Sequence, residues 1–307
     1  MSDFAIYACG GAGTNIGKQI HDLDIDVFFI DTSDSNIRNN KVTNLFLLEG
    51  VDGAGKDRSK TYQHFKDVAE DILIRFKPSQ TLNVVISSLG GGSGAVIAPM
   101  ITKELISKNL NTIVIGIDSQ TSIKELDNTI KTLKTYKSIS DMTKKCVSLF
   151  HISNTSRKEA DKQALYFINL LSVITNKYIT EEFDTSDIHS FINFNKVTDN
   201  SPTVSVIDIS PNENILPEKN TSIVSTVLVT KNKDATISAA IPDYLTNCVV
   251  TDKDYNLEDM RIDNVVGKLS VICEDLEKKM VELTNNKKLN KHKEVEIDDS
   301  TPEGIVL

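Results

Sequence analysis

The chain lacks several features that point to particular classes of protein. Its four cysteines are widely scattered, with no CxxC pair and no metal-ligand spacing: Cys9, Cys146, Cys248 and Cys273. That spacing favours reduced, structural thiols over a disulfide framework or a zinc site. No positively charged segment with a long apolar run opens the sequence, and no stretch approaches the length of a membrane span. We therefore expect a soluble, cytoplasmic protein with no signal peptide and no membrane contact.

An excess of positive charge is missing as well. The formal net charge is −9, which argues against a general nucleic-acid binder, so we expect no direct nucleic-acid partner. The apolar fraction of 39% and the charged fraction of 25% are those of an ordinary globular protein. A length of 307 residues allows one large domain or two modest ones, each with its own core.

The first two-thirds of the chain alternates short apolar runs with amphipathic stretches. We expect strands at 4–8, 27–30, 45–48, 84–88, 112–117 and 148–152, and helices near 14–22, 60–76, 95–108, 122–137 and 157–180. Strands that alternate with helices in this way predict an α/β fold, with a parallel sheet and helices on both of its faces. Ligands of such sheets bind where the carboxyl ends of the strands meet the loops.

The sequence changes character after residue 196. Strands expected at 203–209, 223–230, 236–240 and 248–251 suggest a smaller, mostly antiparallel second domain. The segment 165–179 is apolar on most sides, which is typical of a buried helix between two domains. Apolar residues at helical spacing predict a last helix over 257–283: Val265, Leu269, Ile272, Leu276, Met280 and Leu283.

The last residues, 285–307, are polar and then acidic, and they predict a tail with little structure of its own. Solvation is the ordinary role of such a tail. The apolar end Ile305-Val306-Leu307 favours a docking segment instead.

The most informative segment is Gly90-Gly91-Gly92-Ser93-Gly94. An apolar, β-branched run precedes it and a helical pattern follows it. Glycines between a buried strand and a helix N-terminus let backbone N–H groups converge on an oxyanion, and the helix dipole adds partial positive charge. A flexible linker is the alternative, but linkers are not flanked by a strand and a helix.

A second glycine-rich loop, Cys9–Gly17, also follows a predicted strand. It does not match a dinucleotide-binding fingerprint, because the third glycine is replaced by Ile16, and it does not match a Walker A loop, because Ala12 stands at a required glycine. A closer Walker match at 50–57 ends in Asp57, where a Ser or Thr should reach the magnesium ion.

These loops together resemble the tubulin/FtsZ superfamily over nearly the whole chain. Gly90–Gly94 is similar to the tubulin signature loop, which wraps the nucleotide phosphates in that family. The resemblance implies a GTP/GDP site with Mg²⁺ bound through phosphates and water, without a protein ligand. Its phosphate-binding residues are Gly10, Gly11, Ala12, Gly13, Thr14 and Asn15 in the first loop, Asp31 and Thr32 in the second, Gly53, Ala54, Gly55, Lys56 and Arg58 in the third, and Gly90, Gly91, Gly92, Ser93 and Gly94 in the signature loop.

The resemblance also implies where the catalytic residues lie. In this family an acidic loop after the central helix enters the nucleotide pocket of the next subunit and orients the attacking water. That loop reads NxDxxD in FtsZ, and here Asp184 and Asp187 take its acidic positions while Glu182 replaces the Asn. The alternative is that both aspartates only end one helix and cap another.

The resemblance places three further residues near the nucleoside. Asp161 lies close to the position that reads the guanine edge, Asn154 is in the loop before it, and Asp118 falls at the ribose position. A carboxylate can accept hydrogen bonds from guanine N1 and N2, so GTP remains compatible with Asp161. Lys56 and Arg58 put charge where FtsZ has mostly Gly and Ala, and each could touch the γ-phosphate or lie on the surface.

The short second domain, single terminal helix and acidic tail most resemble the phage-encoded branch of the superfamily. That likeness implies a nucleotide-binding domain over 1–180, a catalytic loop and second domain over 181–256, a helix over 257–284 and a tail over 285–307 that docks on the neighbouring subunit. It implies a head-to-tail homopolymer that hydrolyses GTP and positions phage DNA or the phage nucleus in an infected bacterium.

Three alternatives remain open. The filament could instead segregate plasmid or phage DNA, or act in cell division as FtsZ does. It could be a nucleotide-gated scaffold without hydrolysis. A protein of another class, a dinucleotide-dependent oxidoreductase, would share the strand–turn–helix pattern, although the third glycine of its fingerprint is missing.

Overall fold

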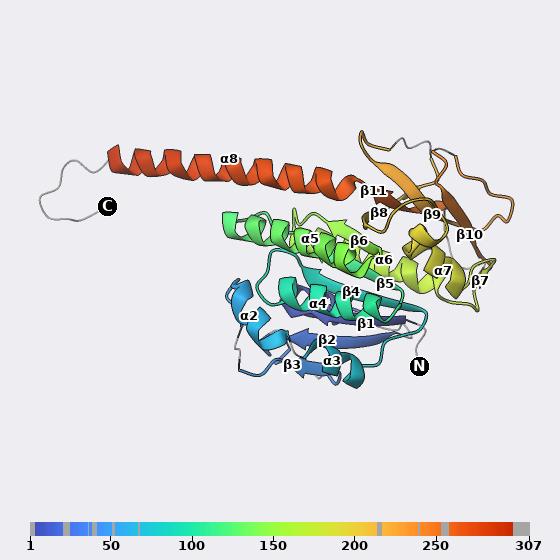
Figure 1. Cartoon of the computed structure of the whole chain (residues 1–307), viewed down its shortest axis with the longest axis horizontal. Coiled ribbons are helices and arrows are strands. Elements are labelled where there is room, and N and C mark those ends of the chain that lie inside the picture. Colours follow the sequence, from blue (N-terminus) through green and yellow to red (C-terminus); the bar gives the residue numbers. More distant parts are fainter. Residues whose placement is uncertain are drawn as a thin grey trace, which may run out of the picture.

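One sheet runs through the whole molecule. The computed structural model describes residues 4–20, 25–35, 37–38, 42–50, 53–66, 68–213, 217–238, 240–252 and 258–296. Within them the sheet has eleven strands in the order β3-β2-β1-β4-β5-β6-β8-β11-β9-β10-β7 (Figure 1). The strands are β1 (Phe4–Cys9), β2 (Asp26–Asp31), β3 (Leu45–Leu47), β4 (Leu82–Ser88), β5 (Thr112–Ile117), β6 (Val147–Ile152), β7 (Thr180–Glu181), β8 (Val204–Pro211), β9 (Ser222–Thr230), β10 (Tyr244–Val250) and β11 (Met260–Val266).

Helices cover both faces of this sheet. They are α1 (Gly10–Gly17), α2 (Arg58–Phe65), α3 (Ala69–Arg75), α4 (Gly94–Ser107), α5 (Ile123–Thr143), α6 (Arg157–Ile174), α7 (Thr185–Ile192) and α8 (Lys268–Glu296), and a 3₁₀ turn follows α7. Alternate residues of a strand point to opposite faces. In β1, Phe4 and Ile6 therefore join the core under α1 and α6, while Ala5 and Tyr7 join the core under α3 and α4.

The predicted parallel half of the sheet is confirmed. All six expected strands form, and β3, β2, β1, β4, β5 and β6 pair in parallel throughout. Their carboxyl ends lie at one edge of the molecule, on the left in Figure 1, and the loops that precede α1, α4, α5 and α6 gather there. The expected ligand edge therefore exists.

The second half differs from the prediction in one strand and one helix. The expected helix over 257–283 is wrong at its beginning, because Met260–Val266 form β11 between β8 and β9, antiparallel to both. Gly267 separates this strand from α8 with a φ of +89°. The strand expected at 236–240 is absent from residues 236–238 and 240, the described part of that segment.

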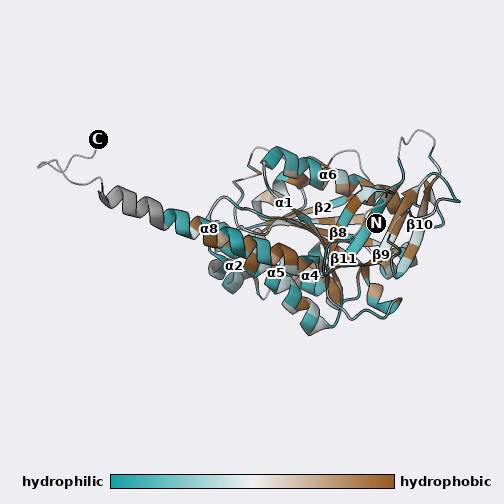
Figure 2. Ribbon diagram, turned by 90° about the horizontal axis from the view of Figure 1, so that it is seen from above, coloured by the Kyte–Doolittle hydropathy of each residue, from teal (hydrophilic) through white to brown (hydrophobic). Residues whose placement is uncertain are grey.

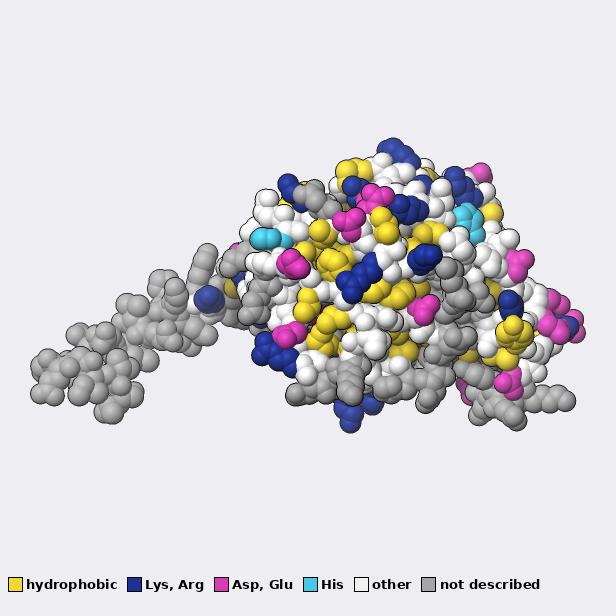
Figure 3. Space-filling model, turned by 90° about the horizontal axis from the view of Figure 1, so that it is seen from below, with side chains coloured by type: hydrophobic (Ala, Val, Ile, Leu, Met, Phe, Trp, Pro, Cys, Tyr) yellow, Lys and Arg dark blue, Asp and Glu magenta, His cyan; other side chains and the backbone are white. Residues whose placement is uncertain are grey.

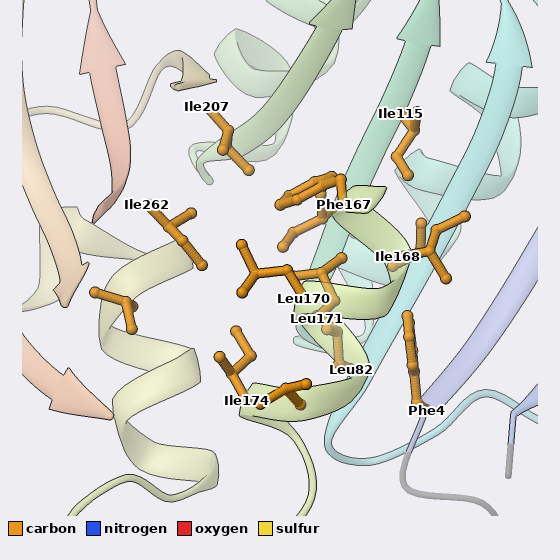
Figure 4. Close-up of a cluster of buried hydrophobic side chains, with 14 of the residues drawn as sticks. Phe4, Leu82, Ile115, Phe167, Ile168, Leu170, Leu171, Ile174, Ile207 and Ile262 are labelled. Carbon is orange, nitrogen blue, oxygen red and sulfur yellow. The ribbon is translucent and has the colours of Figure 1, made fainter. Parts of the chain in front are cut away.

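The central helix α6 is shorter than predicted. It ends at Ile174 instead of residue 180, and Tyr178 beyond it is exposed. Only the second half of α6 is buried on most sides. There Phe167, Leu170 and Leu171 share one hydrophobic cluster with residues of both halves of the sheet, from Leu82 to Ile262 (Figure 4). The division into separate domains therefore stays a prediction.

The terminal helix α8 spans Lys268–Glu296. It therefore begins after the predicted start at residue 257 and ends after the predicted end at residue 283. Its first half packs on α5, with Leu276 buried between the two helices, and it then extends beyond the body of the molecule (Figures 1 and 2). Residues 285–296, part of the predicted tail, are thus helical, and 297–307 lie outside the described residues. Among the described residues no helix is long and apolar enough to cross a membrane.

Candidate nucleotide-binding site

Two helix N-termini meet at the carboxyl edge of the sheet. The first N–H groups of a helix have no partner within it, so each start is a natural anion site. α1 begins at Gly10 and α4 at Gly94, and a Cβ atom on Gly10 would lie 2.7 Å from the backbone nitrogen of Gly94. Only glycines allow this approach, so the two helix starts can face one bound anion together.

Neither start is capped by a side chain. α1 and α4 have no side-chain cap hydrogen bond and no acidic residue in the first turn. Other helices of the chain are capped, for example α5 by Ser122, α6 by Ser156 and α7 by Asp184. The uncapped N–H groups of α1 and α4 are therefore left for a ligand, which fits the predicted phosphate-binding role of Gly10 and Gly94.

The third loop lies directly against the signature loop. A Cβ atom on Gly92 would come within 2.6 Å of the Ala54 side chain and 2.9 Å of the Lys56 backbone, whereas one on Gly91 would meet nothing closer than 3.7 Å. The second loop joins them, because Thr32 Oγ1 lies 2.6 Å from Ser93 Oγ. The structure thus brings together the predicted second, third and signature loops.

Helix α5 holds these loops in place through side chains that the sequence analysis missed. Asn128 donates from Nδ2 to the carbonyl oxygens of Lys56 and Gly90, each at 3.2 Å. Thr132, one turn later, donates to the carbonyl oxygen of Leu89 at 2.9 Å. A polar stripe at i, i+3 and i+7 on a helix next to a glycine loop is the sequence signal that could have found Glu125, Asn128 and Thr132.

Lys56 and Arg58 have different surroundings. The Lys56 ammonium lies 2.6 Å from a carboxylate oxygen of Glu125 on α5. Arg58 is half-buried and donates to the carbonyl oxygen of Asn128 at 3.0 Å and to the hydroxyl of Thr132. Arg58 therefore ties α2 to α5, whereas Lys56 brings a cation to the loop that faces Gly92.

Glu125 is strongly held as an anion. Burial opposes its ionisation, but hydrogen bonds from Lys56, Thr121, Ser119 and Ser122 outweigh burial and lower the pKa of Glu125 to about 2. Its side chain is 11% exposed, so these partners rather than water satisfy the carboxylate.

The predicted ribose residue Asp118 is buried at the end of β5. Burial opposes its ionisation, yet the nearby His151 ring, 3.5 Å from Oδ2, and hydrogen bonds from the Asn154 N–H and Gln120 lower the pKa of Asp118. The Asn154 N–H donates to Asp118 Oδ1 at 2.8 Å, which places these two predicted residues together. Within the described residues no hydrogen bond or ion pair joins Asp161, on the second turn of α6, to the other predicted site residues.

The remaining first-loop residues lie within α1. A Cβ atom on Gly13 would meet the carbonyl oxygen of Ile86 at 2.5 Å, so this glycine lets α1 pack on β4. Thr14 is buried, and its hydroxyl has no hydrogen-bond partner in the described part of the chain. Gly11, Ala12 and Asn15 are half-buried on the same helix. Ile16, which replaces a fingerprint glycine, is fully buried in the core.

The predicted catalytic loop lies at the other end of the molecule. Asp184 and Asp187 begin α7, which contacts residues at the amino ends of the strands: Asp184 lines a pocket with Thr81, just before β4, and His189 bonds Asn111, just before β5. The glycine loops follow the carboxyl ends of these strands (Figure 1). The length of β4, seven residues, separates the two sites by roughly 20 Å.

The two aspartates also form a capping box. Asp184 Oδ1 accepts from the N–H groups of Ser186 and Asp187, and Asp187 Oδ2 accepts from the N–H of Asp184 at 2.9 Å. The other oxygen of Asp187 accepts from the hydroxyls of Tyr244 and Thr246. In the described residues, Asp184 Oδ2 has no such bond, and the Asp184 side chain is exposed. No group of three metal-ligating side chains occurs in this part of the chain.

Sequence and structure comparisons each find similar proteins from phages. No protein-family profile matches the chain. It is 34% identical over 196 residues to a phage tubulin-like protein of Pseudomonas phage PhiPA3, covering 62% of this chain and 61% of that relative. It is 26% identical to a phage tubulin-like protein of Pseudomonas phage phiKZ over 98% of this chain and 97% of the relative.

Solved structures share the fold over the full chain. A protofilament of TubZ from bacteriophage PhiKZ matches with a TM-score of 0.84 and 21% identity, over 100% of this chain and 96% of the other. The phage tubulin PhuZ with GDP matches with the same TM-score, identity and coverage. The mostly parallel sheet flanked by helices is therefore a tubulin/FtsZ-type fold. The chain is similar in sequence to two phage tubulin-like proteins, and it spans about three fifths of the length of the first of them.

Proposed function

We propose that this protein binds and hydrolyses GTP and polymerises head to tail, with each active site shared between two copies. One observation carries the proposal: the phosphate-binding loops and the Asp184–Asp187 loop lie at opposite ends of the sheet. One copy cannot bring its own aspartates to its own glycine loops. Stacked copies related by translation would join the two ends at every contact.

The uncapped starts of α1 and α4 would hold the phosphates, and the loop around Ala54 would close over them. Mg²⁺ would be bound by phosphates and water. Asp118 and Asn154 follow β5 and β6 at the same edge of the sheet, where the nucleoside would extend. The solved phage tubulin with bound GDP supports a guanine nucleotide, and the protofilament and filament structures of phage relatives support self-assembly.

The two aspartates would share the catalytic work unequally. Both oxygens of Asp187 are occupied by hydrogen bonds, from the Asp184 N–H on one side and from Tyr244 and Thr246 on the other. Asp184 is exposed and keeps one oxygen without a bond in the described residues. Asp184 would therefore orient the attacking water, and Asp187 would fix the loop that presents Asp184.

The acidic and apolar tail 285–307 would dock on the neighbouring copy. A groove of about 500 Å³ between α2, α4 and α5 offers fitting chemistry, since Arg58, Lys66 and Lys103 surround apolar residues such as Pro99 and Met100. Figure 3 shows basic, acidic and hydrophobic side chains interspersed on one face of the molecule. The end of α8 extends past the glycine-loop end of the sheet, toward a copy stacked there (Figure 1).

Three experiments test this function. Electron microscopy of the purified protein with GTP, GDP and a slowly hydrolysed analogue should show filaments that depend on the triphosphate. GTP hydrolysis per subunit should rise sharply at the concentration where filaments appear, and a flat rate would overturn the shared site. Deletion of residues 294–307 should raise the critical concentration for assembly. Unchanged assembly would mean that the tail is only solvated and does not dock.

The proposed cellular role is to position phage DNA or the phage nucleus in the host cytoplasm. It rests on the likeness to phage tubulin-like proteins alone. A DNA-segregating or division filament would share the same site. The capping box favours one further candidate, a nucleotide-gated scaffold in which the aspartates only build α7. The absence of GTP hydrolysis by assembled filaments would select that candidate.

A further inference from the structure

The backbone of Lys56 is fixed, while its side chain has room to move. The Lys56 carbonyl oxygen accepts a hydrogen bond from Asn128 at 3.2 Å, and its backbone packs against Gly92. Its φ of +62° lies in the left-handed region, which holds the turn at this residue. The side chain is 50% exposed, so the ammonium is the part of this loop that can change partner.

Glu125 does not depend on Lys56 alone. Its carboxylate also accepts from the Ser122 hydroxyl at 3.1 Å and from the hydroxyl of Thr121. Loss of the ammonium would thus leave a buried carboxylate that keeps its hydroxyl donors, which is far less costly than an unpaired one. The pair Lys56–Glu125 can open without leaving either the loop or the helix unsupported.

We propose that Lys56 exchanges its ammonium between Glu125 and the terminal phosphate of a bound nucleoside triphosphate, so that Glu125 sets the preference for triphosphate over diphosphate. The inference rests on the proposed GTP-binding function and deepens it. The Lys56 backbone lies against Gly92 in the middle of the signature loop, within reach of an anion held by the starts of α1 and α4. Lysine suits this role because it is a compact charge on a flexible stem.

The exchange has a defined energetic logic. A diphosphate ends short of Lys56, so the ammonium stays on Glu125. A triphosphate adds negative charge next to the third loop, and Coulomb attraction then competes with Glu125 for the same ammonium. Glu125 competes only with a triphosphate for the ammonium. It therefore lowers the affinity for the triphosphate and leaves the affinity for the diphosphate unchanged.

The test is the affinity for GTP and for GDP, measured by titration calorimetry below the assembly concentration. Lys56→Met should reduce the ratio of GTP to GDP affinity about tenfold, the equivalent of one ion-pair contact. Glu125→Gln should raise that ratio several-fold, because the ammonium is released. The matched control is Lys131→Met, which removes an exposed lysine of α5 paired with Asp127 and should leave the ratio unchanged.

The opposite directions of the two variants distinguish this exchange from a clamp. If Lys56→Met and Glu125→Gln weaken GTP and GDP equally, the pair only holds the third loop, and the inference is overturned. Thermal unfolding of each variant without nucleotide detects a folding defect, which would lower both affinities together. Failure of the wild-type protein to bind either nucleotide would instead overturn the proposed function.

Discussion

Asp184 and Asp187 each accept a hydrogen bond from the backbone N–H of the other, at 3.2 Å for the bond to Asp184 and 2.9 Å for the bond to Asp187. This reciprocal pair starts α7, so both aspartates have a structural role whether or not they act in catalysis. A simple alanine variant would therefore mix two effects, and the choice of substitution decides what an experiment measures.

Two substitutions at Asp184 separate these effects. Asp184→Ala removes the cap and should lower the free energy of unfolding by about 1 kcal/mol. Asp184→Ser keeps a capping oxygen, so its stability should remain close to that of the wild type. Urea unfolding measures both. If Asp184 orients water, both variants should hydrolyse GTP slowly within filaments; a serine variant with full activity would assign Asp184 to α7 alone.

Neighbouring glycines in the signature loop should respond differently. Gly92→Ala places a methyl group 2.6 Å from Ala54 and should displace the third loop, with a loss of nucleotide affinity of at least tenfold. Gly91→Ala meets only ordinary contacts at 3.7 Å and should leave the third loop in place, so it shows what a methyl group elsewhere in the same loop does to affinity. Nucleotide titration of the two variants checks this, and equal affinities would show that the third loop does not rely on Gly92.

The pH dependence of stability should contain a contribution from Glu125. Its pKa of about 2 in the folded protein lies below the usual value, so the unfolded chain binds the proton more tightly. The stabilisation is complete above the ordinary pKa of a glutamate, near 4.3, and is lost as the pH falls toward 2.

Urea unfolding between pH 3 and pH 6 tests this. The wild type should lose stability more steeply toward pH 3 than Glu125→Gln does. Glu70→Gln removes an exposed carboxylate that pairs with Lys108 and should keep the wild-type slope. Parallel curves for all three proteins would contradict the assignment.

The contact of α8 with α5 should depend on Leu276. This side chain is buried between the helices, and Leu276→Ala should destabilise the protein by about 2–4 kcal/mol. Val281→Ala, on the exposed side of the same helix, should change stability by less than about 0.5 kcal/mol. Thermal unfolding measures both effects. A larger cost for the Val281 variant would mean that α8 packs through its other face.

The sequence predicted the parallel half of the fold well, because each strand there is an apolar run bounded by a loop. The sequence did not predict β11. Two charged residues of this strand, Arg261 and Asp263, are buried as an ion pair, so the strand lacks the apolar pattern from which the others were predicted. Val265 lies at helical spacing from the apolar residues of α8. The predicted helix was therefore begun too early, before Gly267. A glycine within a helical pattern was the available warning.

The sequence predicted the glycine loops of the candidate site. It did not predict the side chains of α5 that hold these loops in place. Gly10, Gly92 and Gly94 lie in contacts that only glycine permits, so the sequence itself records the geometry. Asn128 and Glu125 act through tertiary contacts with loops distant in sequence. Their spacing on one face of α5 can be read from the sequence, but a single sequence does not show which loops that face contacts.

The separation of the glycine loops from Asp184 has a genetic consequence. Every active site would combine the front of one copy with the back of another, so two different inactive variants could complement each other. In an equal mixture of Gly92→Ala and Asp184→Ser subunits, about a quarter of the junctions would pair an intact front with an intact back. A cell that expresses both variants would thus retain part of a function that neither variant provides alone.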